Sequence, residues 1–162
     1  MKLMMFALVG LLVYGQSDAI GKVESEFDKK ANFAALHTYT WSGGAPALNA
    51  EAHRLVVAAF EKEMAARGFK QVASGADVTL SYYNVTSNDV DLKKLEEIEK
   101  AGGGTAPTIM RARMLIVMRS AASHQQLWSA ITREHVEPTQ LAATVARVAE
   151  RLFATYPGNK PR

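Results

Sequence analysis

The sequence predicts an α+β domain, in which an antiparallel or mixed sheet of four to five strands carries two amphipathic helices packed on one face. Two observations predict this class. Segments in which apolar and polar residues alternate lie on both sides of a long segment with helical periodicity, and a second helical segment closes the chain. The 162 residues are 48% hydrophobic and 22% charged, which suits one domain with one core.

Two short strands are expected at the start of the domain. In residues 22–28, Val23, Ser25 and Phe27 alternate with charged side chains, so Val23 and Phe27 would face the core. Residues 37–41 (HTYTW) are β-branched and aromatic, which favours a second strand. The Ser-Gly-Gly-Ala-Pro sequence that follows is typical of a loop.

The clearest helix lies between Asn49 and Gly68. The Asn49 side chain can accept backbone N–H bonds as an N-cap, and Gly68 can take the left-handed conformation that ends a helix. Apolar residues recur at helical spacing between them, at Ala52, Leu55, Val56, Ala59, Phe60 and Met64. This periodicity predicts one apolar face that covers the sheet.

Three further strands are expected in the second half of the chain. Residues 77–86 alternate apolar and polar side chains, which predicts a strand with one solvated face. Residues 108–119 alternate a methionine-rich face with a face that bears three arginines. Residues 126–133 would return as the antiparallel partner of this strand in a hairpin.

The charged segment between these strands, residues 87–107, has a different character. It predicts a short helix capped by Asn88 or Asp89, or else a mobile excursion between two strands. Pro138 fits the first turn of a final helix. The core stripe of that helix would be Leu141, Val145, Val148 and Leu152.

Residues 1–19 (MKLMMFALVGLLVYGQSDA) have the composition of a signal peptide. Their apolar run of about twelve residues would span only about 18 Å as a helix, short of the ~30 Å hydrocarbon core of a bilayer. Ser17 and Ala19 fit the small-x-small pattern of signal peptidase, so we expect cleavage after Ala19. This predicts a periplasmic or secreted protein with one domain over residues 20–157 and a flexible basic tail over 158–162; an uncleaved anchor is the alternative.

A set of short motifs, in a fixed order, resembles the bacterial cell-envelope family known as domain of unknown function 4136. These motifs are Phe27-Asp28, Tyr39-Thr40-Trp41, Arg67-Gly68-Phe69, DVTLSYY from Asp77, MLIVM from Met114, Leu127-Trp128 and Tyr156-Pro157. The resemblance implies an envelope protein related to lipoproteins. Many relatives carry a cysteine for lipid attachment, but this chain has no cysteine, which implies a soluble periplasmic protein. Relatives also carry an acidic residue and a glycine near the tip of the last hairpin, where this chain has RSAASHQQ.

The residue patterns of catalytic and metal sites are not found in the sequence. The absence of cysteine excludes disulfides, zinc–thiolate sites and thiol nucleophiles. No serine lies in a G-x-S-x-G sequence, and the glycine triplet at 102–104 lacks the lysine of a phosphate-binding loop. The four histidines are His37, His53, His124 and His135. No two of them are spaced as in the H-x-H or H-x-x-x-H pattern of a local metal site. We therefore expect no catalytic residue, no metal and no cofactor.

The arginine-bearing face of strand 108–119 is the most specific charged feature. Arg111, Arg113 and Arg119 would share it, and guanidinium groups match the oxygens of carboxylates, phosphates and glycans. The alternative is a solvated face, or one paired with the glutamates of segment 87–100. Tyr83 is a further candidate for the binding surface. The aromatic residues Tyr82, Tyr83, Trp41 and Trp128 could line a groove, although packing in the core or on the sheet surface is the commoner role of such residues.

These observations predict a non-enzymatic, exported binding or structural domain of the bacterial envelope. Its partner would be an envelope protein or an anionic ligand, with peripheral membrane contact as a possibility, and its oligomeric state stays open. A net charge of +3 is too small to predict a nucleic-acid partner. One alternative is a hydrolase that acts on an anionic substrate, for which His37, Asp77 and His135 would have to converge. Another is an assembly subunit that adds a strand edge to a neighbour.

Overall fold

The computed structural model describes residues 21–45, 47 and 49–158. The predicted leader and residues 159–162 of the predicted tail lie outside this part of the chain. Within it, the strands of one mixed sheet are β1 (Val23–Phe27), β2 (Thr38–Trp41), β3 (Lys70–Gln71), β4 (Val78–Val90), β5 (Thr108–Ser120) and β6 (Gln126–Val136). The helices are α1 (Ala50–Ala66), α2 (Leu92–Lys100) and α3 (Leu141–Phe153), with 3₁₀ turns at Phe33–Ala35 and Pro138–Gln140.

The strand order is β1-β6-β5-β4-β2-β3. The first four strands pair antiparallel, whereas β2 runs parallel to both β4 and β3. The predicted class, an α+β domain with a mixed sheet, is confirmed. The predicted count of four to five strands is wrong, because β3 is a two-residue strand whose Lys70 and Gln71 show no alternation.

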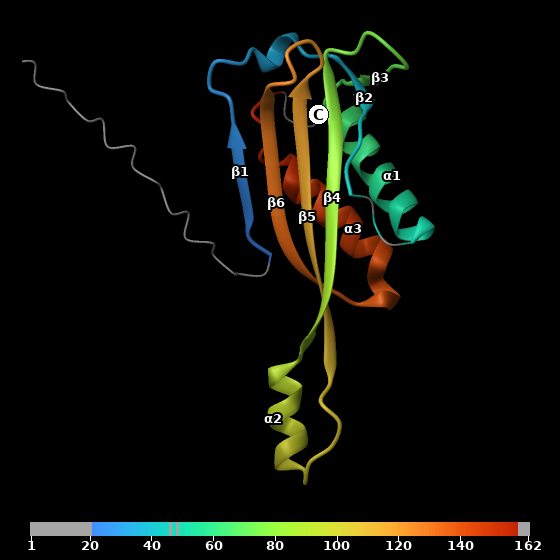
Figure 1. Ribbon diagram of the computed structural model, residues 1–162, viewed down its shortest axis with the longest axis vertical. Helices are drawn as coiled ribbons and strands as arrows, with labels where there is room; N and C mark the ends of the chain where they lie inside the picture. The colour runs from blue at the N-terminus through green and yellow to red at the C-terminus, as the bar shows by residue number, and fades with distance from the viewer. Residues whose placement is uncertain (1–20, 46, 48, 159–162) are drawn as a thin grey trace, which may run out of the picture.

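Helices α1 and α3 cover the same face of the sheet, as predicted (Figure 1). Asn49 caps α1 through a hydrogen bond of 2.7 Å from the Ala52 N–H to its Oδ1. The expected stripe on α3 is also present, because Val145, Val148 and Leu152 are buried and Leu141 packs at its margin. The apolar stripes of α1 and α3 therefore determine which sides of these helices face the sheet.

The core lies between these two helices and the inner face of the sheet. Trp128 of β6 and Phe153 of α3 are both fully buried, with ring centroids 5.3 Å apart. Phe60 of α1 lies 5.6 Å from the ring of Phe153, so the two helices share one aromatic cluster. Phe27 departs from its prediction: it is 47% exposed at the end of the edge strand β1 and contacts Phe33 edge-on.

The β4–β5 hairpin continues well beyond the helix layer and carries α2 at its far end (Figure 1). The predicted caps for this helix are wrong. Asn88 and Asp89 belong to β4, where they pair with Met110 and Ile109, because the ladder to β5 continues past the expected end of the strand. The N-cap is Asp91, whose Oδ1 accepts a hydrogen bond of 3.1 Å from Lys94 N.

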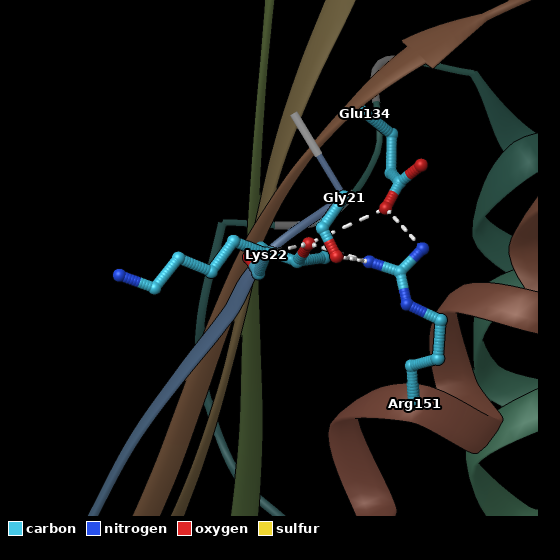
Figure 2. A network of polar contacts seen from close by, with 5 residues as sticks. Gly21, Lys22, Glu134 and Arg151 are labelled. Carbon is cyan, nitrogen blue, oxygen red and sulfur yellow. Dashed lines mark hydrogen bonds and ion pairs between the residues drawn. The ribbon is translucent and has the colours of Figure 1, made fainter. Parts of the chain in front are cut away.

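A buried ion pair ties α3 and the start of β1 to β6 (Figure 2). Arg151 Nη1 lies 2.8 Å from Glu134 Oε1, and the Glu134 side chain is only 9% exposed. Arg151 also donates to the carbonyl oxygen of Gly21, and the Thr132 hydroxyl donates to the carbonyl oxygen of Lys22 at 3.1 Å. These contacts give the Arg151, Glu134 and Thr132 side chains polar partners at one margin of the core.

Asp77 fixes the start of β2 against β4. Its Oδ2 accepts hydrogen bonds from His37 N at 2.9 Å, from Thr38 N at 2.8 Å and from the Thr38 hydroxyl at 2.9 Å. The bond from the His37 backbone, followed by those from Thr38, lowers the pKa of the Asp77 carboxyl below its usual value. The sequence had offered Asp77 as a catalytic candidate, but here it organises the backbone.

We expect Asp77→Ala to lower the melting temperature at pH 7. The folded-state pKa of Asp77 is depressed, so its stabilisation is present above the unfolded-state pKa of about 3.9 and is lost as the pH falls through the folded-state value. The difference in melting temperature between wild type and variant should therefore shrink towards pH 2. Differential scanning calorimetry across this range measures it, with Glu97→Ala on α2 as the matched control. An equal difference at pH 7 and pH 2 would contradict this role.

Candidate anion-binding face of the sheet

The face of the sheet opposite α1 and α3 carries the predicted arginines. Side chains alternate along a strand, so Met114, Ile116 and Met118 of β5 are buried under the helices while Arg111 and Arg113 are exposed on the other side. Figure 1 looks onto this outer face, with the helices behind it.

Strand β6 adds two residues to this face. Arg133 lies directly opposite Arg113, and His135 lies directly opposite Arg111. Directly opposed like charges destabilise an antiparallel pair. We define Arg111, Arg113, Arg133 and His135 as the arginine cluster. Such a concentration of positive charge on adjacent strands is a pattern suited to binding an anion.

The three arginines of the cluster line a groove of about 260 Å³ that also includes Val85, Ser87 and Asp89 of β4. Asp89 Oδ2 lies 3.3 Å from Arg111 Nη1, and the two side chains are 50% and 45% exposed. An ion pair this exposed contributes little to stability. The Asp89 carboxylate therefore holds the Arg111 guanidinium beside the groove. A bound phosphate, sulfate or carboxylate could replace this contact.

The structure brings together some of the predicted site residues and separates another. Tyr83 lies on the outer face opposite Leu115, one row along from the row of Arg113, and it does not line the groove. Arg119 is on the same face but six residues along β5 from Arg113, a distance of about 20 Å. Arg119 therefore does not belong to the groove.

Arg133 was not predicted as a site residue, and His135 was considered only for the alternative hydrolase. Their alternation with buried Thr132 and Glu134 is visible in the sequence and could have placed them on the outer face. What the sequence does not reveal is which residues of β5 they face. That pairing follows from a register shift in the hairpin between Met118 and Arg119, where Met118 pairs with Trp128 and Arg119 with Gln126.

The residues required for a hydrolase do not converge. Asp77 adjoins His37, but the hydrogen bond comes from the His37 backbone N–H. His135 pairs with Arg111 near the α2 end of the sheet, whereas Asp77 precedes Val78, which pairs with Ser120 at the opposite end.

A different histidine does form a paired site. His53 of α1 shares a hydrogen bond through Nδ1 with the hydroxyl of Tyr82, and the two rings stack at 5.7 Å. Burial raises the pKa of Tyr82, and the hydrogen bond from Ala47 N partly offsets this. The pair lies at a surface hollow lined in part by Trp41 and Val57.

Two wider searches concern the described residues alone. Among residues 21–45, 47 and 49–158, no group of three His, Cys, Asp or Glu side chains is arranged to hold a metal ion. In that same part of the chain, none of the helices has the length and apolar character required to cross a membrane.

Solved structures share this fold at low sequence identity. A PDZ domain protein from Parabacteroides distasonis matches 85% of the chain at 12% identity with a TM-score of 0.57, and the match covers 36% of that protein, so this chain spans about a third of its length. The PelC dodecamer from Paraburkholderia phytofirmans matches 85% of this chain and 99% of its own at 10% identity, also with a TM-score of 0.57.

A lipoprotein from Neisseria meningitidis matches 74% of this chain and 99% of its own at 8% identity, with a TM-score of 0.46. The search of curated proteins found no match. A family model, in contrast, matches residues 23–158, which include every strand and helix of the sheet and its cover. The chain therefore belongs to the family described as domain of unknown function DUF4136, the family whose motifs its sequence resembles.

Proposed function

We propose that this protein is a non-enzymatic, exported binding domain of the bacterial envelope, and that it binds an anionic ligand on the outer face of its sheet. One observation carries the proposal: Arg113 lies directly opposite Arg133, with Arg111 and His135 in the next row. The ligand class is a phosphate, sulfate or carboxylate, because guanidinium forks match these oxygens.

Two further features support a binding role. The groove contains Ser87 and Asp89 beside the arginines, and the side chains of Arg111 and Asp89 are 45% and 50% exposed, so a charged group can reach them from solvent. The residues that a hydrolase would require are spread over both ends of the sheet. Anion binding at an open face needs no activated nucleophile or general base.

The arginine cluster can be tested by charge reversal. We expect R111E/R113E to weaken binding at least tenfold, because each charge-assisted hydrogen bond contributes about 1.5–3 kcal/mol. Two probes identify the source of the anion: soluble polyphosphate, measured by isothermal titration calorimetry, and vesicles of phosphatidylglycerol and phosphatidylcholine, measured by cosedimentation. Binding should weaken as salt rises, since these charges are exposed.

A matched control is R54E/R147E. Arg54 of α1 and Arg147 of α3 are exposed on the helix layer, so this double variant changes the net charge equally on the opposite side of the sheet. R119E tests the boundary of the site and should retain binding. If the two double variants lose affinity equally, the binding depends on net charge and the proposed site is wrong.

Export is tested through the leader. We expect the full chain, expressed in a Gram-negative host, to reach the periplasmic fraction with Ile20 as its first residue, because the residues up to Ala19 fit a signal peptide. Cell fractionation with N-terminal sequencing measures this outcome. A periplasmic protein that still begins at Met1 would instead support an uncleaved anchor.

A second candidate function is self-assembly, favoured by the apolar residues on the projecting hairpin. Val90 and Leu92, two residues apart at the end of β4 and the start of α2, are 36% and 73% exposed. Exposed apolar patches commonly mark protein interfaces. The PelC neighbour is described as a dodecamer, although a likeness at this identity extends to the fold alone.

Light scattering coupled to size-exclusion chromatography tests this candidate. If the hairpin mediates assembly, residues 20–162 should form an oligomer, and Leu92→Glu should reduce its mass because a charge cannot be buried at an apolar contact. Lys93→Glu, at an exposed position next in the helix, is the control. A monomer at every concentration tested would rule out self-assembly through this surface.

A further inference from the structure

We propose that a cavity between the helix layer and the inner face of the sheet binds a small apolar molecule that carries one hydroxyl group. This cavity is on the opposite side of the sheet from the arginine cluster. The inference is therefore independent of anion binding, and either can fail without the other.

The cavity has the size and walls of a small apolar site. Its volume is about 120 Å³. Its apolar walls come from both helices and from β5, through Val56, Val145, Val148, Met110, Ala112 and Met114. For comparison, an engineered apolar cavity of about 150 Å³ in another protein holds one benzene molecule. A single aromatic ring or a short alkyl chain is thus the size of occupant that this cavity can accept.

Asn84 places a hydrogen-bond acceptor in the wall of the cavity. It lies on the inner face of β4 and lines the cavity, and its side-chain Oδ1 is buried without a hydrogen-bond partner in the described part of the chain. Its backbone N–H is already used, since it donates to the Ala45 carbonyl oxygen at 2.8 Å. Buried acceptors are nearly always satisfied in folded proteins. A ligand hydroxyl that donates to this oxygen would satisfy it.

One further group on the wall, the Glu134 carboxylate, argues against an anionic occupant. Glu134 also lines the cavity, and its Oε1 lies 2.8 Å from Nη1 of Arg151. The carboxylate would repel a second negative charge in this partly buried space. The ligand class is accordingly neutral, with an apolar body and a single hydroxyl.

Phenol and toluene are matched probes, since they have nearly the same size and differ by the hydroxyl. We expect both to shift the amide resonances of residues around the cavity in ¹⁵N NMR titrations of residues 20–162. Phenol should bind about threefold to tenfold more tightly than toluene, which is what one net hydrogen bond contributes.

Three variants separate the two parts of the inference. Asn84→Leu removes the acceptor at similar volume, so it should keep toluene binding and abolish the preference for phenol. Ala112→Leu fills the cavity and should abolish binding of both probes. Ala146→Leu, on the exposed face of α3, makes a comparable change elsewhere and should alter neither affinity.

The melting temperature of each variant establishes that it is folded before the titrations are interpreted. If neither probe shifts resonances around the cavity of the wild type, the site does not exist. Equal affinities of the wild type for phenol and toluene would overturn the role of Asn84. Binding that survives Ala112→Leu would place the probes elsewhere on the protein.

Discussion

Trp128 of β6 is fully buried beneath α3, with its ring 5.3 Å from that of Phe153, and this contact anchors the helix layer to the sheet. The same cluster reaches α1 through Phe60. Large aromatic groups contribute much of the buried apolar area in a domain of this size. Because α1 and α3 both pack on this one face, the opposite face of the sheet is left to interact with solvent or a ligand. The positions of the charged groups follow from that asymmetry.

The two faces of β5 and β6 accordingly have opposite chemistry. Under the helices, the Glu134 carboxylate is paired with Arg151, whereas the Asn84 Oδ1 is buried without a hydrogen-bond partner among the described residues. On the outer face, Arg113 and Arg133 oppose each other across the strand pair, where a pair of opposite charge would be more stable. Burial of the inner face thus fixes which side chains point outward, and the register decides which of them meet.

The helix layer and most strands were predictable because their signals are local. Asn49 caps α1 through its own side chain, and the stripe of α3 follows from spacing along the chain. The errors arose where long-range pairing overrode local signals. Residues 88 and 89 resemble helix caps, yet β5 extends the ladder through them, and β3 exists only because β2 offers Lys70 and Gln71 an edge to join. Phe27 alternates correctly, but an edge position leaves it half covered.

The sequence by itself determined the α+β class, the two helices that share a face and the arginines at alternate positions of β5, because periodicity is a property of neighbouring residues. The tertiary structure alone decided that Arg113 faces Arg133, that Arg119 lies apart from them, and that Asn84 borders a cavity with its Oδ1 unsatisfied. These features depend on the strand register and on how closely the helices pack against the sheet. Both are set by contacts between residues far apart in the chain, which no local pattern encodes.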